Sequence, residues 1–480
     1  MVAAKRGSVV APQARRLPET SSSGVRVAEI FNTSQLRLEA SAYGVEMRRA
    51  VAAVRGSPFD AIALLGDSGL CTEAHNAFRF RRIYVSSSHG VPFLSSSNII
   101  EIRPRPEHFL SRLLTKHLDD LLVKKWDVLI SCSGTVGNVC LAGDGIAGMA
   151  LSQHVIRMRA SDANTSGFAA AFLRSRFGRP QLSQAAYGSV VQHIEPEHLE
   201  RVVVPGIPPI RRGAIGAEMC KASELRDRAN ALLDEADAGL CEMVGLPSIH
   251  AMTRKDRTRP RVHLKNLASR FEARFHDPAA TALIQKLLKR PLSSVALGSA
   301  SVADVRAVTK FRKRLYVRTG GMPLLPSKQL FQVDPIEVKG LARGAHLKDL
   351  PEIQLSENMI LVTCSGTVGR VHIVPKYMAA WAASQDALRI VAAPAMHPGF
   401  LYAWLASPYG QLLVNRYAYG SVIVHIDREM LAAVPVPVLP NRQMQDVGDK
   451  VLAANSLRHE AWEREMKAIR DLERLIEPQT

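Results

Sequence analysis

The sequence predicts an α+β protein built from two tandem copies of one domain, each followed by a long helix. Three observations indicate this fold class. The segment Cys-Ser-Gly-Thr-Val-Gly occurs at residues 132–137 and again, 232 residues later, at 364–369. Short apolar stretches bounded by glycine turns surround both occurrences, as is typical of strands. Residues 211–243 and 443–476 repeat apolar side chains every three or four positions, which predicts two long amphipathic helices.

The same offset relates further segments, so the duplication covers a whole domain and not a single motif. A repeat this long indicates two copies of a domain, because solenoid repeats are about 20–50 residues long. The other recurring segments are Tyr84-Val85 and Tyr316-Val317, Ser152-Gln153 and Ser384-Gln385, Tyr187-Gly188-Ser189-Val190 and Tyr419-Gly420-Ser421-Val422, His193-Ile194 and His425-Ile426, and Pro205 and Pro437.

Composition and proline placement divide the chain into five parts. The first 26 residues are rich in arginine, serine, alanine and proline, which predicts a disordered basic arm. A Val-Pro segment closes each domain, because proline removes a backbone donor and ends the element it enters. A basic stretch at 254–261 is expected to be a solvated linker. The predicted parts are the arm at 1–26, a first domain at 27–206, a central spacer helix at 207–245, a second domain at 246–440 and a C-terminal spacer helix at 441–480.

A strand with one charged face is predicted near the start of each domain. Basic and apolar residues alternate at 78–85 in the first domain and at 310–317 in the second. Alternation is the pattern of a strand whose two faces meet different surroundings. The basic residues of these segments are Arg79, Arg81 and Arg82, and Lys310, Arg312, Lys313 and Arg314.

The repeated segment at 132–137 and 364–369 follows an apolar strand and precedes another, so it is predicted to be a tight glycine turn. Its Ser and Thr hydroxyls lie beside backbone N–H groups, an arrangement that suits a phosphate or a base edge. A plain hairpin whose hydroxyls satisfy only its own backbone is the alternative interpretation of this segment.

Each of the two predicted helices carries one apolar stripe, the pattern of a coiled-coil seam. Packing against its own domain is the alternative for each helix, but two equal helices favour packing on each other. At ~1.5 Å per residue, each helix would be on the order of 50 Å long, a spacer rather than a core element. The predicted seam positions are Ile215, Met219, Ala222, Leu225, Ala229, Leu232, Ala236, Leu240 and Met243, and Val447, Val451, Ala454, Leu457, Ala461, Ala468, Leu472 and Leu475.

Bulk properties favour a nucleic-acid partner over a membrane. The formal net charge of the 480-residue chain is +18, and a balance this basic favours a polyanion. No apolar run approaches the roughly 18 residues that a membrane span needs. The six cysteines form no CxxC pair, which argues against a zinc site or disulfide framework and predicts a reducing, cytoplasmic location.

Enzyme signatures are absent from the sequence. It contains no nucleotide-binding glycine loop, no His-Glu-x-x-His and no nucleophile elbow. Asp334, Glu337 and Lys339 are similar to the carboxylate–lysine set of metal-dependent nucleases, so that function remains an alternative. His193 and His425 have no carboxylate or nucleophile near them in sequence and are interpreted as structural or DNA-contacting. We therefore predict no catalytic residue, no metal site and no cofactor.

Taken in order, these segments resemble the specificity (S) subunit of type I restriction–modification systems. No single motif is specific, but the ordered set occurs twice. The matching pieces are Arg37-Leu38-Glu39-Ala40 and Arg270-Phe271-Glu272-Ala273, the two Ser-Gly-Thr-Val-Gly turns, Gln153-His154 and Gln385-Asp386, both Tyr-Gly-Ser-Val…His-Ile segments, the Val-Pro exits, and the long helix after each copy. The exits depart from the Pro-Pro-Leu-x-Glu-Gln that the family often carries, reading Pro208-Pro209-Ile210-Arg211-Arg212 and Leu439-Pro440-Asn441-Arg442-Gln443.

The resemblance implies two target-recognition domains, each of which reads one half of a split double-stranded DNA sequence. It implies that the two helices pair antiparallel and dock methyltransferase (M) subunits, two in number, with a restriction/motor (R) subunit completing a phage-defence complex. The S subunit itself would be non-catalytic and would direct adenine methylation and cleavage by its partners. A stand-alone DNA-binding scaffold or regulator is a further alternative. The expected DNA contacts are Arg79, Arg81, Arg82, Ser133, Thr135, Lys310, Arg312, Lys313, Arg314, Ser365 and Thr367.

Overall fold

The computed structural model describes residues 44–186, 192–253, 262, 267, 270–289, 292–309 and 313–477. The described residues form a mixed α+β structure with one long central helix and one long C-terminal helix, which confirms the predicted class. Six sequence predictions lie outside the described residues: the arm at 1–26, the segments 37–40 and 187–190, the linker 254–261, and the side chains of Lys310 and Arg312.

The first half of the structure, residues 44–206, contains two four-stranded sheets and one strand pair. The sheet orders are β2-β9-β6-β7 and β3-β5-β4-β8, and β1 pairs with β10. The elements are α2 (Val45–Arg55), β1 (Ala61–Ala63), β2 (Cys71–Asn76), β3 (Tyr84–Val85), β4 (Gly90–Leu94), β5 (His108–Ser111), β6 (Val128–Ser131), β7 (Val139–Leu141), β8 (Ala150–Leu151), β9 (Val155–Ala160), α3 (Ala163–Arg174), α4 (Arg179–Ala185) and β10 (Val203–Pro205).

The second half, residues 270–440, has the corresponding strand orders β12-β19-β16-β17 and β13-β15-β14-β18, with β11 paired to β20. Its elements are α7 (Pro278–Leu287), β11 (Ser294–Ala296), β12 (Ala303–Arg306), β13 (Tyr316–Val317), β14 (Met322–Leu325), β15 (Lys339–Leu341), α8 (Leu350–Ile353), β16 (Ile360–Thr363), β17 (Val371–Ile373), β18 (Ala382–Ala383), β19 (Ala387–Ala392), α9 (Pro398–Ala406), α10 (Pro408–Tyr417), α11 (Arg428–Ala432) and β20 (Pro435–Pro437).

Strand register also corresponds between the halves. Val128 of β6 lies opposite Leu141 of β7, and Ile360 of β16 lies opposite Ile373 of β17. Both members of the second pair lie 232 residues after their counterparts in the first. The strands β6 and β16 are buried along their whole length, which explains their continuous apolar sequence.

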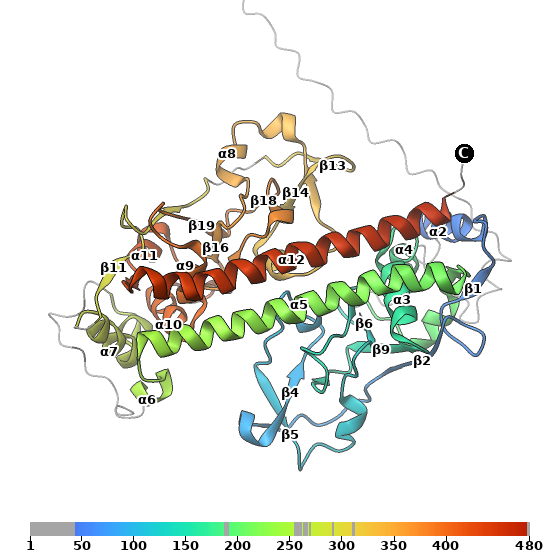
Figure 1. Ribbon diagram of the computed structural model, residues 1–480, viewed down its shortest axis with the longest axis horizontal. Helices are drawn as coiled ribbons and strands as arrows, with labels where there is room; N and C mark the ends of the chain where they lie inside the picture. The colour runs from blue at the N-terminus through green and yellow to red at the C-terminus, as the bar shows by residue number, and fades with distance from the viewer. Residues whose placement is uncertain are drawn as a thin grey trace, which may run out of the picture.

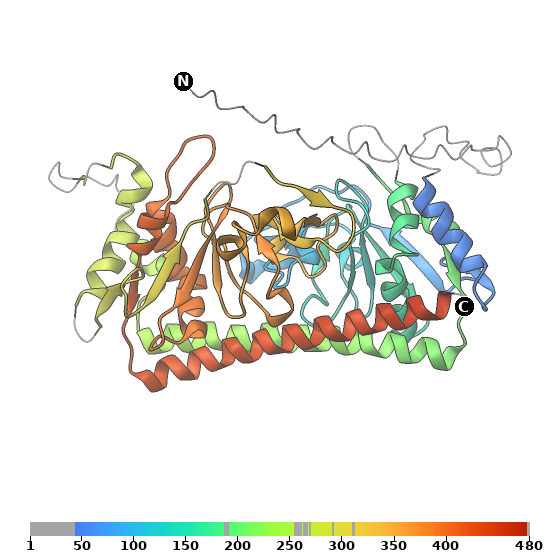
Figure 2. The same ribbon diagram turned by 90° about the horizontal axis from the view of Figure 1, so that it is seen from above.

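Two helices of 36 residues each, α5 (Pro209–Val244) and α12 (Asn441–Ile476), lie side by side along the molecule (Figure 1). The core of the first half packs against one end of this helix pair, and the core of the second half packs against the other end. Ile215 near the start of α5 and Leu472 near the end of α12 belong to the first core. Leu240 near the end of α5 and Val447 near the start of α12 belong to the second. The two helices therefore run in opposite directions, and in Figure 2 both halves lie on one side of them.

The predicted seam is displaced by one position at two points along each helix. An α-helix has 3.6 residues per turn, so a stripe of strict threes and fours rotates away from a straight packing line by about 20° per heptad. Leu232, Met243, Leu457 and Leu475 are only half-buried, whereas their neighbours Leu233, Val244, Arg458 and Ile476 are buried. None of the helices among the described residues is long and apolar enough to cross a membrane.

The strand predicted at 78–85 is wrong over most of its length. Among the described residues, strand pairing there is confined to β3, Tyr84–Val85, and in the second half to β13, Tyr316–Val317. The preceding residues run from β2 in one sheet to β3 in the other and form no ladder of their own, although the Ile83 carbonyl accepts the Ser111 N–H at 2.9 Å. The alternating pattern at 78–83 instead reflects aromatic packing, since the Phe80 ring contacts the Phe93 ring edge to face with centroids 6.4 Å apart, within the distance usual for aromatic pairs.

Candidate nucleic-acid interface

The repeated turn of the first half is closed by its own side chains. Ser131 donates its hydroxyl hydrogen to the carbonyl of Thr135 at 2.6 Å and accepts the Asn138 N–H at 3.0 Å. Gly134 and Gly137 have φ values of +78° and +90°, which side chains with a Cβ resist. Thr135 is left exposed at the tip of the turn.

The turn of the second half is built in the same way. Thr363 donates to the carbonyl of Thr367 at 2.5 Å and accepts the Arg370 N–H at 3.0 Å. Gly366 and Gly369 have φ values of +74° and +90°. Thr367 is exposed, as its counterpart is in the first half. The hydroxyls that satisfy the backbone thus precede the turn, and the tip threonines face solvent.

Each turn is held between two other segments of its half. The Cys132 N–H donates to the carbonyl of His154 at 3.0 Å, and the Gly134 N–H donates to the carbonyl of Gln192 at 3.1 Å. Ser133 is half-buried and forms an isolated bridge with His193. These bonds position the turn beside the segment that carries Gln153 and His154.

The second half repeats this arrangement. The Cys364 N–H donates to the carbonyl of Asp386 at 2.9 Å, and the Gly366 N–H donates to the carbonyl of Val424 at 3.0 Å. Ser365, also half-buried, forms the bridge with His425. The sequence predicted the turn in each copy, but not what it packs against.

The basic segment and the turn of each half meet at a glutamine. Arg82 donates from Nη2 to Oε1 of Gln153 at 3.0 Å, and Arg314 donates to Oε1 of Gln385 at 2.5 Å. The main-chain carbonyl of each glutamine also accepts a hydrogen bond from the thiol of the cysteine at the start of the turn. The structure therefore brings together two features that the sequence had only identified separately. The side-chain amide N–H groups of each glutamine and the other N–H groups of each arginine are donors beside this contact.

Further basic side chains surround this contact in the first half. Arg79 and Arg81 are exposed, and the Arg82 guanidinium lies over the Phe93 ring at 5.2 Å from its centroid. Burial lowers the pKa of His154, and the neighbouring Arg82, His193 and Arg79 lower it further. The surface next to the turn is therefore electropositive.

The second half differs at one point of this arrangement. Asp386 takes the place of His154 in the sequence and accepts a hydrogen bond from the Ser384 hydroxyl at 3.1 Å. Lys313 is exposed, and Arg314 is half-buried against Gln385. An acceptor in one half thus stands where a histidine stands in the other, beside the same Arg–Gln contact.

Asp334 and Lys339, two residues of the nuclease-like carboxylate–lysine set, do not face a common point. The Asp334 carboxylate binds Arg174 at 3.0 Å and Arg179 at 2.5 Å, both from the first half. Burial by itself would raise the pKa of Asp334, but these two guanidinium groups outweigh it and lower the pKa. Lys339 instead lies over the Tyr316 ring, with Nζ 5.3 Å from the centroid. Within the described ranges, no group of three His, Cys, Asp or Glu side chains could hold a metal ion.

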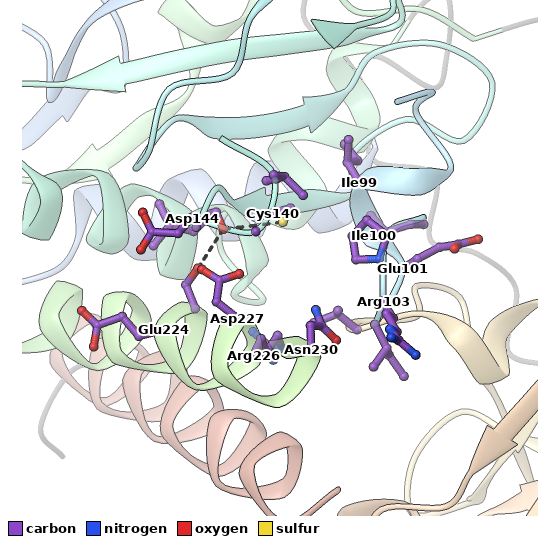
Figure 3. Close-up of a pocket in the computed structure, with 18 of the residues that line it drawn as sticks. Ile99, Ile100, Glu101, Arg103, Cys140, Asp144, Glu224, Arg226, Asp227 and Asn230 are labelled. Atoms are coloured by element: carbon purple, nitrogen blue, oxygen red, sulfur yellow. Dashed lines mark hydrogen bonds between the residues drawn. The ribbon is translucent and has the colours of Figure 1, made fainter. Parts of the chain in front are cut away.

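A cavity of about 750 Å³ lies where the first half, α5 and the second half meet (Figure 3). Arg226 on α5 and Asp334 line it, together with Arg174 of the first half and Glu465 of α12. Glu465 is buried and binds both Arg174, at 2.8 Å, and Arg226. We refer to Arg174, Arg226, Asp334 and Glu465 as the central ion cluster.

The central ion cluster was not predicted from the sequence. The sequence did contain a signal for a buried charge on α12. Glu465 occupies the one position of the predicted apolar stripe that lies between Ala461 and Ala468. A carboxylate on an apolar stripe indicates a buried partner, because an unpaired buried charge is strongly unfavourable. The identity of that partner depends on the tertiary structure.

Two glycine pairs, also missed, let each half approach a long helix closely. A Cβ added to Gly216 on α5 would lie 1.8 Å from the carbonyl oxygen of Asn164, and one on Gly167 of α3 would lie 2.4 Å from the Gly216 oxygen. A Cβ on Gly399 of α9 would lie 2.2 Å from the oxygen of Gly448 on α12. Both pairs obey the repeat offset of 232, a signal that could have revealed them.

Comparison with known proteins gives matches among solved structures. No family model matches the chain, and no curated protein sequence matches it. The S subunit of the type I restriction–modification system from M. genitalium is 12% identical, with a TM-score of 0.31 over 87% of this chain and 100% of that chain. The HsdS subunit from Thermoanaerobacter tengcongensis is 13% identical, with a TM-score of 0.27 over 89% and 100%.

A third structure comes from work on complex assembly and conformational transition of the type I R-M system. It is 14% identical, with a TM-score of 0.27 over 88% of this chain and 99% of that chain. The solved structures similar to this chain thus include S subunits of type I systems, the family that the sequence motifs resemble. The function proposed below rests on the geometry of this chain's own residues.

Proposed function

We propose that this chain is the DNA-specificity subunit of a type I restriction–modification complex, with two target-recognition domains that arose by tandem duplication. One observation carries the proposal. The same Arg–Gln contact lies beside the same glycine turn once in each half, as Arg82–Gln153 and Arg314–Gln385. A duplicated surface rich in N–H donors suits a partner that repeats along its length and presents acceptors, which double-stranded DNA does.

The binding energy would come chiefly from arginine and lysine on phosphates. Such contacts release counterions, so affinity would fall steeply with salt. We propose contacts from Arg79, Arg81, Arg82, Lys310, Arg312, Lys313 and Arg314, with Ser133, Thr135, Ser365 and Thr367 at the turns. The exposed tip threonines and the exposed arginines of the first half support this assignment.

Sequence discrimination would arise where the halves differ. His154 and Asp386 occupy corresponding positions beside the two Arg–Gln contacts. A carboxylate accepts from the amino groups of cytosine or adenine, whereas a protonated or neutral histidine can donate to guanine. The two domains would therefore read different bases, which gives an asymmetric bipartite site.

The remaining parts follow from the same proposal. The domains would span 27–206 and 246–440, with spacer helices at 207–245 and 441–480 and a basic arm at 1–26. The helices would form an antiparallel coiled coil, supported by the packing of their opposite ends into each core. The partners would be two M subunits, an R subunit and DNA, and the chain itself would be non-catalytic and cytoplasmic. This set of partners is the one that the sequence resemblance implies.

The test is to map methylated adenines in cells with and without this chain. We expect one bipartite motif whose methylation disappears when the chain is deleted. Replacing residues 27–206 with the corresponding domain of a homologue should change one half of the motif only, because each domain reads separately. A swap that altered both halves, or methylation that persisted without the chain, would contradict the proposal.

We expect the Arg314 guanidinium to contact a phosphate of the DNA backbone. Replacing Arg314 with alanine should then weaken DNA binding, and the slope of log affinity against log salt concentration should fall by the contribution of about one phosphate. Affinity would be measured between 50 and 200 mM salt, roughly the range in which counterion release dominates. Arg306→Ala is the matched control, since Arg306 is an exposed arginine of the same half that pairs with Asp304 at 2.6 Å. An unchanged slope for Arg314→Ala would remove it from the set of phosphate contacts.

A further inference from the structure

The two halves are joined directly by backbone hydrogen bonds. The Ile102 N–H donates to the carbonyl of Phe331 at 2.7 Å, and the Val333 N–H donates to the carbonyl of Ile100 at 2.8 Å. The side chain of Ile102 is buried in a core cluster formed otherwise by the second half. A short ribbon of two antiparallel segments therefore crosses between the halves, and we call it the junction ribbon.

The junction ribbon contains the same segment from each half. Leu94 lies on β4, which pairs with β8, and Leu325 lies on β14, which pairs with the corresponding strand β18. The two leucines are 231 residues apart in the sequence. The same spacing relates Glu101 to Gln332, the two residues of the antiparallel bridge between the halves. Exchanging the halves exchanges the two hydrogen bonds. The contact is thus self-complementary, like the twofold interface of a symmetric dimer.

Ion pairs reinforce the junction ribbon on both sides. Glu101 of the first half binds Arg370 of the second at 3.1 Å. Asp334 of the second half binds Arg174 and Arg179 of the first. Arg174 and Asp334 belong to the central ion cluster, so the junction is also tied to α5 and α12 through Arg226 and Glu465.

We propose that the junction ribbon and its ion pairs determine the distance and rotation between the two DNA half-sites. This inference rests on the proposed function. Two long helices can bend gently along their length, whereas a direct contact between the halves closes a rigid frame with the helix pair. One base pair of extra spacing moves a half-site by about 3.4 Å and turns it by about 35°. A frame that resists such a shift would reject DNA whose gap differs by one base pair.

A disulfide across the ribbon tests whether the junction persists on DNA. Glu101 and Gln332 form the bridge pair without hydrogen bonds to each other, for which Cα atoms lie about 4.5 Å apart, within disulfide range. The double variant Glu101→Cys/Gln332→Cys would be oxidised in the full chain with its methyltransferase partners. Native thiols should react slowly, since burial raises the pKa of Cys71 and Cys132 to about 12 and of Cys140, Cys220 and Cys364 to about 11.

A loosened variant tests the spacing directly. Glu101→Ala/Asp334→Ala removes one carboxylate from each side of the junction. Its control is Glu73→Ala/Asp304→Ala, which removes two carboxylates that pair with arginines inside their own halves. Each protein complex would be titrated with duplexes that carry the native gap, or a gap one base pair shorter or longer.

We expect the oxidised double-cysteine variant to bind the native-gap duplex as the wild-type chain does. The loosened variant should lose about tenfold of its preference for the native gap, and the control should keep it. The inference is overturned if the oxidised variant cannot bind, or if the loosened variant keeps the wild-type preference. If the wild-type complex shows no bipartite preference at all, the proposed function fails, and the yield of the disulfide still reports on the junction.

Discussion

Replacing Glu465 with alanine is expected to lower the free energy of unfolding by about 3–5 kcal/mol, because it leaves the buried guanidinium of Arg174 and the partly buried guanidinium of Arg226 without their shared carboxylate. The Glu465 side chain is 3% exposed and lies within 2.8 Å of Arg174, whose side chain is equally buried. It also binds Arg226 through both carboxylate oxygens. Thermal and urea unfolding of the full chain would measure the loss.

The stabilisation from Glu465 should depend on pH in a defined direction. Burial alone would raise the pKa of Glu465, but Arg174 and Arg226 overcome this and lower it to about 2. Since the folded pKa lies below the unfolded value of about 4.3, the contribution is complete above that value and is lost as pH falls toward 2. The stability difference between wild type and Glu465→Gln should therefore shrink as the pH is lowered from 5 to about 2.

Glu463→Ala is the matched control for Glu465→Ala. Glu463 is two residues away on the same helix, but its side chain is 61% exposed and faces His459. Exposed ion pairs contribute about 0–1 kcal/mol, so this variant should be nearly neutral. Equal losses in the two variants would mean that the central ion cluster contributes no more than a surface pair.

Replacing Gly216 with alanine should destabilise the protein by about 3 kcal/mol or more, at the upper end of overpacking effects. The new Cβ would lie 1.8 Å from the Asn164 carbonyl oxygen, and a backbone atom cannot move aside by changing rotamer. The start of α3 would have to separate from α5, which would displace the first half relative to the helix pair. A loss of melting temperature, accompanied by weaker binding at one half-site, is the expected result.

Gly213 and Gly239 provide controls on the same helix. A Cβ at either position would meet nothing within 4 Å. Alanine in a helix interior is favoured over glycine by roughly 0.5–1 kcal/mol, so both substitutions should stabilise the protein slightly. If Gly216→Ala behaved like these two variants, the close crossing of α3 and α5 would not be a requirement of the fold.

The candidate nucleic-acid interface could be predicted only in part from the sequence. The turn at 132–137 could be predicted because its glycines and hydroxyls act within a few residues, and the structure gives it positive φ values at Gly134 and Gly137. The contact of Arg82 with Gln153 joins residues 71 positions apart, and no periodic pattern encodes it. The strand predicted at 78–85 is wrong before Tyr84 for the same reason, since alternation does not reveal that the chain crosses between two sheets.

The α+β class, the two long helices and the duplicated motif that relates the two halves could all be predicted from the sequence. These features are local or repetitive: 3.6-residue periodicity, apolar runs and a constant offset are visible without knowing which segments meet. The pairing of Glu101 with its own counterpart Gln332, and the place of Glu465 between Arg174 and Arg226, become visible only in the folded chain. Those contacts depend on how two distant halves dock on one helix pair, because burial and charge pairing are properties of the assembled core.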